Sequence, residues 1–358
     1  MKKSQPDKNQ GVGSVGIGWG ASCSQFLSMP RKHLAIQLCS SIPVMESYLT
    51  ISKLLSLCLR FCSVKDANQR HIQNTFVSLP DFMGAQHRIL RFGVCGKRNT
   101  VTMMRITVLG CGTSQGVPVI GCDCPVCRSK DPRDKRTRTS ILIETELLTI
   151  AVDAGPDFRQ QMLRENVTHL DAVLITHEHK DHIGGLDDLR PFIFSQKAPM
   201  PIYASAEAQV EIKREYSYAF DEHPYPGAPD YRLVTLDETP FDLGGLHIEP
   251  IKLQHYTLTC YAFRIGKFAY VTDLSEMPES AMERLRGIDY LIIEALGLNK
   301  HYSHLNLSQA REITERLNVK KAWFTHLSHR IGLTEQVNRE LPENMNLAYD
   351  GLKFEIHE

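Results

Sequence analysis

Apolar and polar residues divide the chain into two parts with different patterns. Residues 1–103 begin with a polar, Gly-rich stretch and continue with weakly periodic segments, in which no alternation of strands and helices emerges. From residue 104 onward, short apolar runs typical of buried strands alternate with helix-like segments. The pattern predicts a folded domain over residues 104–358. It predicts a poorly ordered or non-native N-terminal extension over residues 1–103.

The predicted strands of the second part are short and rich in β-branched and aromatic residues. Pro156 stands at the favoured first position of a helix that runs to residue 164, and Ser308 is a suitable N-cap for a helix to residue 317. Two further helical stretches are expected, at residues 183–189 and 206–218. Strands mixed with helices predict an α+β fold in which helices cover packed sheets. The strands are expected at residues 105–109, 140–144, 148–152, 172–175, 231–236, 247–253, 261–265, 268–271, 288–293, 321–324 and 352–356.

Charge is distributed unevenly between the two parts. Residues 1–104 carry 13 Lys and Arg against 4 Asp and Glu, a net charge of +9, whereas the other 254 residues carry 28 against 37, a net of −9. The acidic second part argues against nucleic acid as a partner. The best candidate for a membrane span, residues 48–62, is short and interrupted by Lys53 and Arg60. We therefore predict a cytoplasmic protein without a membrane partner.

The densest chemical signal follows the apolar run at residues 172–175. Three imidazoles and a carboxylate occur within six residues, at His177, His179, Asp181 and His182. Nitrogen and oxygen donors in this mixture suit zinc or manganese, and residues after a strand can converge on a cleft. A solvated polar loop is the simpler alternative, but this density of ligands favours a metal site.

The H-x-H-x-D-H arrangement resembles the signature of the metallo-β-lactamase superfamily. The resemblance implies an αββα sandwich of two β-sheets flanked by helices. It also implies two divalent metal ions, zinc or manganese, in the active site. One ion would be held by the first two histidines and a later histidine, the other by the Asp and the last histidine with a further histidine, and another Asp would bridge both.

Candidates for the later ligands occur in the order that the resemblance requires. His255 closes one predicted strand in LQHY, Asp273 follows the next but one in YVTD, and His326 follows another in FTHLSH. Two neighbouring ions would lower the pKa of a shared water and create hydroxide near neutral pH. Asp181 would then help orient that hydroxide, and Asp273 would set the spacing of the metals.

A second group of metal ligands precedes the first predicted helix. Cys122, Cys124 and Cys127 supply three thiols within six residues, which suits a structural zinc with four ligands. The alternative is a set of buried free thiols. The residues alone leave the fourth ligand open, since Cys111, Cys260 and several histidines compete for that role.

Five segments together resemble a narrower family, the PhnP-like phosphoribosyl 1,2-cyclic phosphate phosphodiesterases. They are GCGTSQGVPVIGCDCPVC, THEHKDHIGGL, YVTD, THLSH and YDGLKFEI, and the resemblance covers the chain from about residue 105. It implies that His329 is the fourth ligand of the structural zinc. It also implies an extra catalytic histidine, for which His304 is the better match and His301 the spare. The aromatic and Pro-rich stretch within residues 190–232 departs from the family by its greater length, and we expect it at the rim of the active site.

We therefore predict a dinuclear metal-dependent hydrolase that cleaves a small cyclic phosphodiester, such as phosphoribosyl 1,2-cyclic phosphate, by metal-bound hydroxide. Asp181 and His304 are the expected catalytic residues. A nuclease of the tRNA 3′-end type, a thioester or lactam hydrolase, and a non-enzymatic metal-binding protein are the alternatives. The sequence leaves open the physiological substrate, the identity of the metals and the formation of a homodimer.

Overall fold

The computed structural model describes residues 73–76, 91–94 and 103–357. The chain divides into two units, Met1–Gly96 and Lys97–Glu358. In the first unit, β1 (Gln73–Phe76) pairs antiparallel with β2 (Arg91–Val94). The prediction for residues 1–103 lies almost wholly outside the described residues and stays a prediction. The second unit contains two large β-sheets.

The first large sheet has seven strands, antiparallel on one side and parallel on the other. The pairs among β16, β3, β4 and β5 are antiparallel, and those among β5, β6, β7 and β8 are parallel. The strand order is β16 (Lys353–His357), β3 (Met103–Gly110), β4 (Ser140–Glu144), β5 (Thr149–Val152), β6 (Ala172–Leu174), β7 (Met200–Ala204) and β8 (Tyr231–Thr235).

The second large sheet repeats this division. The pairs among β15, β14, β13 and β12 are parallel, and those among β12, β11, β10 and β9 are antiparallel. The strand order is β15 (Met345–Leu347), β14 (Lys321–Thr325), β13 (Tyr290–Glu294), β12 (Phe268–Val271), β11 (Leu258–Ile265), β10 (Leu246–His255) and β9 (Phe241–Leu243).

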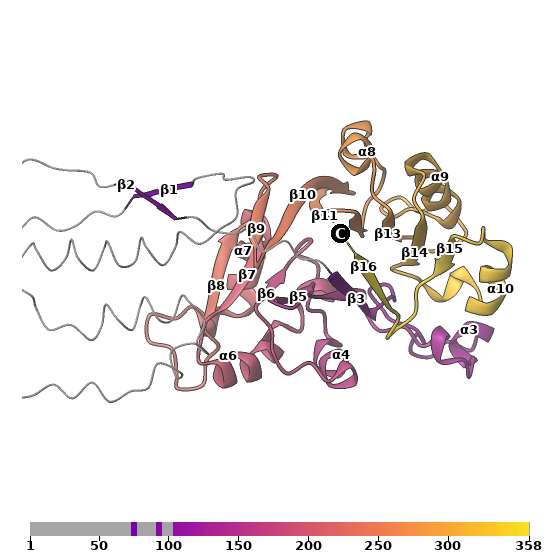
Figure 1. The fold of residues 1–358 in the computed structure, drawn as a ribbon. Helices are drawn as coiled ribbons and strands as arrows, with labels where there is room; N and C mark the ends of the chain where they lie inside the picture. Colours follow the sequence, from indigo (N-terminus) through magenta and orange to yellow (C-terminus); the bar gives the residue numbers. More distant parts are fainter. Residues whose placement is uncertain (1–72, 77–90, 95–102, 358) are drawn as a thin grey trace, which may run out of the picture. The chain divides into compact units, whose positions relative to one another are not determined.

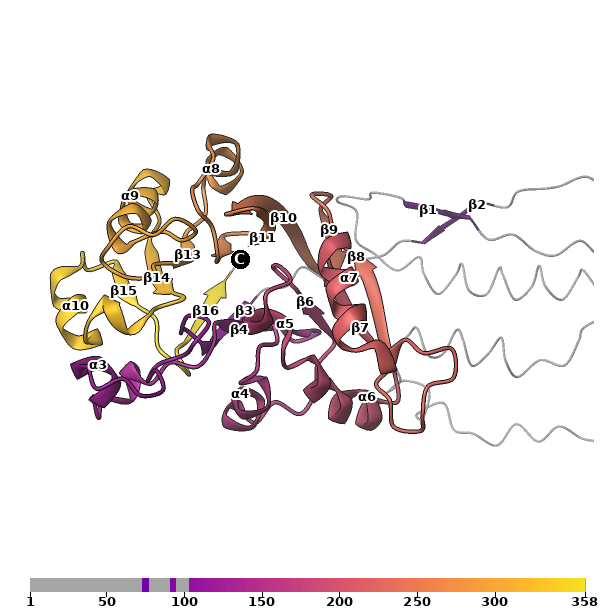
Figure 2. The ribbon, with the colours of Figure 1, turned by 180° about the vertical axis from the view of Figure 1, so that it is seen from behind.

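Helices cover the outer faces of both sheets (Figures 1 and 2). On the first sheet, α4 contacts β3, and α7 contacts β7 and β8; on the second, α8 contacts β10, α9 contacts β13 and β14, and α10 contacts β15. The α-helices are α3 (Pro125–Arg128), α4 (Phe158–Glu165), α5 (Lys180–Ile183), α6 (Arg190–Gln196), α7 (Ala206–Glu215), α8 (Glu279–Leu285), α9 (Leu307–Leu317) and α10 (Thr334–Glu340). Four 3₁₀ helices join them among the described residues, at η1 (Pro132–Asp134), η2 (Leu186–Leu189), η3 (Ser217–Ala219) and η4 (His329–Ile331).

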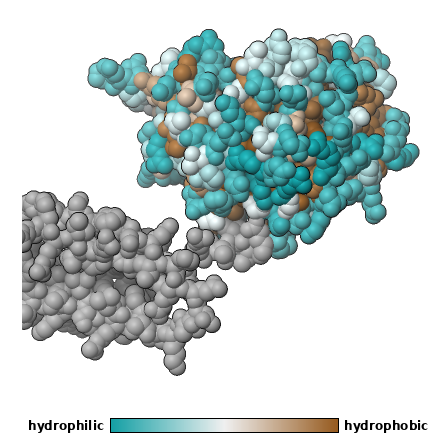
Figure 3. Space-filling model, turned by 90° about the horizontal axis from the view of Figure 1, so that it is seen from above, coloured by the Kyte–Doolittle hydropathy of each residue, from teal (hydrophilic) through white to brown (hydrophobic). Residues whose placement is uncertain are grey.

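Alternate residues of β4 pack into two different apolar clusters, which explains why helices and sheets form four layers. In β4, Ile141 and Ile143 belong to the apolar cluster that includes Ile251 of the second sheet, whereas Leu142 belongs to the cluster that includes Phe158 of α4. Both faces of the first sheet are therefore buried, one against the other sheet and one against helices. The outer surface is a mosaic of hydrophilic and hydrophobic residues (Figure 3). The predicted αββα sandwich is confirmed.

Several local predictions were wrong in detail. The helix expected from Pro156 begins at Phe158, after a turn. The helix expected from Ser308 is capped by Asn306, whose side chain accepts from the backbone of Gln309 while the Gln309 side chain accepts from the backbone of Asn306. The stretch at residues 183–189 is two short helices, α5 and η2, and the helix expected over residues 206–218 ends at Glu215. The sequence pattern missed β7, β9, β15, α3, α6, α8 and α10.

Among the residues that the structure describes, no helix is long and apolar enough to cross a membrane.

Candidate metal centre

Polar side chains collect where strands of the two sheets end. His177 and His179 come shortly after β6, Asp273 comes after β12, and His326 directly follows β14, while His255 is the last residue of β10. Parallel neighbours end at the same edge of a sheet, so β12, β13 and β14 bring their following residues together. The topology therefore builds one site from residues up to 149 positions apart in the chain, from His177 to His326.

Three residues at these strand ends adopt an unusual backbone conformation. Asp153, Asp273 and His326 have φ values of +66°, +54° and +55°, in the left-handed region that side chains with a Cβ rarely occupy. Such strain persists where surrounding contacts determine the conformation, and it clusters at functional sites. Each of the three follows a strand, so the same turn reorients the chain at β5, β12 and β14.

The first group of candidate ligands consists of His177, His179 and His255. Their ligand atoms lie within 4.8 Å of one another, and His177 Nε2 is 3.0 Å from His179 Nδ1. His177 and His255 are buried, whereas His179 is exposed, so the site opens to solvent on the side of His179. Burial lowers the pKa of His177 well below its ordinary value. This favours the neutral imidazole that metal ions bind.

The second group consists of Asp181, His182 and His326, and Asp273 lies between the two groups. His182 Nε2 is 3.2 Å from Asp181 Oδ2 and 3.3 Å from Asp273 Oδ2. His326 Nε2 is 3.3 Å from Asp273 Oδ1. Burial acts to raise the pKa of Asp181 and of Asp273, but the neighbouring histidines outweigh it and lower both pKa values.

The buried nitrogens of the second group indicate what the site holds. His182 Nε2 and His326 Nε2 have no hydrogen-bond partner among the described residues. Buried polar atoms normally have a partner, because an unsatisfied one costs about 1–3 kcal/mol. A divalent cation would satisfy both nitrogens, and the donor set of imidazoles and carboxylates suits zinc or manganese. The seven predicted side chains therefore converge in a geometry that fits two metal ions.

A buried carboxylate that the sequence pattern did not single out supports this group. Asp153 Oδ2 accepts a hydrogen bond from His182 Nδ1 at 2.7 Å, and both residues are fully buried. Asp153 also accepts from the backbone N–H and the hydroxyl of Thr176. With Nδ1 held by this acceptor, the His182 imidazole could offer its Nε2 to a metal ion, which would displace the proton there.

The predicted extra histidine lies beside the shared Asp273. His304 Nδ1 is 2.8 Å from Glu294 Oε2 and 3.7 Å from Asp273 Oδ1. Burial acts to lower the pKa of His304, but Glu294 outweighs it and raises this pKa to about 9. His301 is exposed and lies one ring further out, with its centroid 5.3 Å from that of His304. The geometry therefore favours His304 over His301 as the additional histidine of the site.

Glu294 is a second residue that sequence reasoning missed. It ends β13 and is fully buried, and its Oε1 accepts from the backbone N–H groups of Leu274 and Leu305. These bonds hold the carboxylate in place between β12 and the loop that carries His304. Its place at the end of an apolar run marks it as an acid near the core, but the sequence does not show that the carboxylate is buried beside a histidine.

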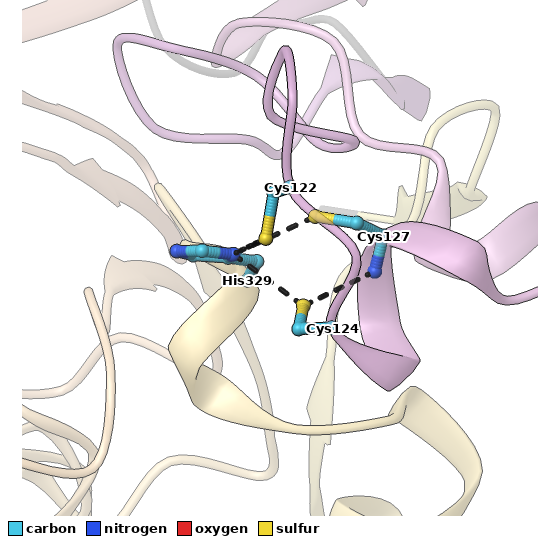
Figure 4. A group of neighbouring side chains, drawn as sticks. All are labelled: Cys122, Cys124, Cys127 and His329. Carbon is cyan, nitrogen blue, oxygen red and sulfur yellow. Dashed lines mark hydrogen bonds between the residues drawn. The ribbon is translucent and has the colours of Figure 1, made fainter.

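The three cysteines form a separate group with His329 (Figure 4). His329 Nδ1 lies 3.2, 3.5 and 3.5 Å from the Sγ atoms of Cys122, Cys124 and Cys127. Tetrahedral zinc with ordinary bond lengths would place nitrogen and sulfur ligands about 3.6 Å apart. A backbone hydrogen bond from Cys127 lowers the pKa of Cys124 to about 6, which favours the thiolate that binds metal. The group therefore fits a structural zinc.

The two other cysteines that were candidates for the fourth zinc ligand do not belong to the group of Cys122, Cys124, Cys127 and His329. Cys111 and Cys260 are buried free thiols outside the cysteine group. Cys260 donates to the carbonyl of Thr272, and the backbone N–H of Cys111 donates to Asp350.

The aromatic stretch that was expected at the rim packs largely elsewhere. The Tyr218 hydroxyl donates to Asp187 of η2, and the Arg190 guanidinium lies 5.4 Å from the Tyr218 ring. In Figures 1 and 2 the loop before β8 extends past α6, away from β13 and β14. Near the start of this stretch, the Tyr216 hydroxyl donates to the carbonyl of Ile183 in α5, next to the metal ligands Asp181 and His182.

Comparisons with known proteins agree with this geometry. A family model described as a beta-lactamase superfamily domain matches residues 149–327. A solved structure of a new diphosphatase from the PhnP family is 39% identical, with a TM-score of 0.67, and the match covers 71% of this chain and 97% of that chain. Zinc-bound PqqB from Methylobacterium extorquens shares the fold at 18% identity, with a TM-score of 0.58, over 70% of this chain and 99% of that one.

A curated protein of Porphyromonas gingivalis named octanoyltransferase is also similar to this chain. It is 40% identical over 258 residues, which are 71% of this chain and 52% of that protein. The chain thus spans about half the length of that relative, and the name octanoyltransferase does not by itself describe the matched half.

The chain belongs to the metallo-β-lactamase superfamily. Family and ligand groups together define a metal-dependent hydrolase. Within the superfamily the chain is similar to the PhnP-family diphosphatase, which confirms the predicted resemblance.

Proposed function

We propose that the chain hydrolyses a phosphodiester bond in a small molecule, for which ribose cyclic phosphates such as phosphoribosyl 1,2-cyclic phosphate are the first substrates to examine. The observation that carries the proposal is the pair of His304 and Glu294 beside the two ligand groups. This pair adds a proton donor to a dinuclear site, and a phosphodiester needs both charge neutralisation and a protonated leaving group.

The ligand groups assign a place to each metal ion. His177, His179 and His255 would hold one ion, and Asp181, His182 and His326 the other, with Asp273 shared. When bound, two divalent ions would lower the pKa of a water and neutralise charge on the phosphate oxygens.

The remaining chemistry rests on side chains. Glu294 accepts a hydrogen bond from His304 Nδ1–H and keeps the imidazole charged near neutral pH, because it raises the pKa of His304 against the effect of burial. The other ring N–H of His304 is then available to donate to a phosphate oxygen or to the leaving alkoxide. Asp181 and Asp273 stay ionised and would fix the positions of the cations.

The test is a substrate screen of the full chain loaded with zinc or manganese. It would compare ribose cyclic phosphates and bis-p-nitrophenyl phosphate with ADP-ribose, nitrocefin, a thioester and precursor tRNA. ADP-ribose is included because the relative that is 39% identical is named a diphosphatase. Greater kcat/KM on the lactam, the thioester or the tRNA than on every small phosphate substrate would refute the proposal.

Substitution of His304 tests its role as proton donor. We expect His304→Ala to lower kcat about 10²- to 10⁴-fold on an alkyl leaving group, and much less on p-nitrophenolate, which needs no protonation. The matched control is His169→Ala, because His169 pairs with Asp171 at the same distance of 2.8 Å on the surface. An equal loss on both leaving groups would assign His304 a structural role.

A further inference from the structure

Two exposed tyrosines adjoin the metal centre and have no role in the site described above. Tyr256 directly follows His255, and Tyr302 lies two residues before His304. Their residues are 61% and 73% exposed, among the exposed large hydrophobic residues of the described chain. Their ring centroids are 5.4 Å apart in an edge-to-face arrangement. Two segments distant in the sequence thus place aromatic rings side by side at one point of the surface.

The pair lies next to the opening of the site. The ring of His255 is 5.0 Å from that of the exposed His179 and 4.7 Å from that of His304. On the other side, Tyr302 stacks on His301 at 4.4 Å, and His301 lies 5.3 Å from His304. Tyr302 is therefore two ring contacts from His304, and Tyr256 is one contact further along the same chain of rings.

The backbone holds this arrangement in place. Tyr256 has a φ of +53°, which is rare for a bulky residue and persists only where contacts determine it. Its N–H donates to Ser275 Oγ at 2.6 Å, and its carbonyl accepts from Gln254 Nε2 at 2.8 Å. The loop of Tyr302 is tied to the ligands, because the carbonyl of Ser303 accepts from His255 Nδ1 at 2.9 Å.

We propose that Tyr256 and Tyr302 determine substrate specificity by stacking on a planar ring, such as a nucleobase, of the phosphodiester bound in the metal site. The inference rests on the proposed function for the identity of that site. Rigid tyrosines provide large contact areas at little entropic cost, and stacking on aromatic side chains tolerates any base because every base has a π-face. Phosphodiesters that carry a nucleobase are then preferred over bare ribosyl phosphates.

Binding and turnover of matched ligands test the proposal on the metal-loaded full chain. Calorimetry would compare adenosine 5′-phosphate with ribose 5-phosphate, and kinetics would compare adenosine 2′,3′-cyclic phosphate with ribose 2,3-cyclic phosphate. We expect the base to improve Kd or kcat/KM about five- to 150-fold. Tyr302→Leu should abolish this preference, whereas Tyr302→Phe should retain it. The control Tyr225→Leu removes an exposed tyrosine on the segment beyond α6 and should change nothing.

The binding measurements test the stacking role independently of the proposed hydrolysis. An equal Kd for adenosine 5′-phosphate and ribose 5-phosphate would overturn the stacking role. A preference for the base that persists in Tyr302→Leu would also overturn it, and both results are independent of whether any substrate is turned over. Loss of base-dependent binding in Tyr302→Leu without turnover of any phosphodiester would support stacking and refute the proposed function. A change of oligomeric state in Tyr302→Leu with the base preference unchanged would identify the pair as a subunit contact and also overturn the inference.

Discussion

Replacement of Asp153 by asparagine tests whether this buried carboxylate sets the state of a metal ligand. Both oxygens of Asp153 are occupied, since Oδ1 accepts from the backbone N–H of Thr176 at 2.9 Å and Oδ2 accepts from His182 Nδ1 at 2.7 Å. Asparagine has the same shape but one acceptor and one donor group. In Asp153→Asn, one of the two N–H groups must therefore lose its acceptor.

The two orientations of the amide have different costs. If the NH₂ group faces His182, the imidazole must accept at Nδ1 and carry its proton on Nε2, which blocks the metal. Metal affinity then falls about 10- to 100-fold, or about 1.4–2.7 kcal/mol. If the NH₂ group faces Thr176, a buried backbone N–H is left without an acceptor, at a cost of about 1–3 kcal/mol of stability. That loss corresponds to about 2–4 °C in Tm per kcal/mol for a unit of this size.

The assay combines a metal titration of activity with thermal unfolding of the metal-free protein. We expect Asp153→Asn to need more metal for half-maximal activity or to have a lower Tm. The control is Asp242→Asn, because Asp242 pairs with His247 at the same 2.7 Å but both side chains are more than half exposed. Unchanged metal dependence and unchanged Tm in Asp153→Asn would refute the assignment of His182 Nε2 as a ligand atom oriented by Asp153.

Three further substitutions probe other parts of the molecule. His179→Ala should abolish turnover and lower the metal content measured by atomic emission, and retention of both would contradict its role as a ligand. Cys124→Ala should release about one zinc ion per chain and lower Tm, because a structural site contributes directly to folding; an unchanged zinc content would refute the site. Arg136→Met should cost about 3–5 kcal/mol in denaturant unfolding, because the buried Asp134 loses its partner. Arg133 pairs with Asp131 in a more exposed position, so Arg133→Met should lower the free energy of unfolding by less than about 1 kcal/mol. Similar losses in Arg136→Met and Arg133→Met would contradict the reasoning.

The features that could be predicted from the sequence are those with a local cause. The run before His177 is a buried strand because its residues are uniformly apolar, and the following ligands are dense enough to indicate a metal centre. Cys122, Cys124 and Cys127 form a group because their spacing alone keeps three sulfurs within reach of one ion. The order of His255, Asp273 and His326 along the chain was enough for the resemblance to the superfamily.

The residues that support these ligands from distant parts of the chain could not be predicted in this way. Asp153 and Glu294 sit at the ends of apolar strands, where no local pattern distinguishes a carboxylate that orients a histidine from one that faces solvent. The pairing of Tyr256 with Tyr302 depends on how the turn after β10 meets the loop after β13. Hydrophobic periodicity reports the environment of a single helix or strand. Which elements lie next to one another is decided by sheet order and strand register, which this periodicity does not encode.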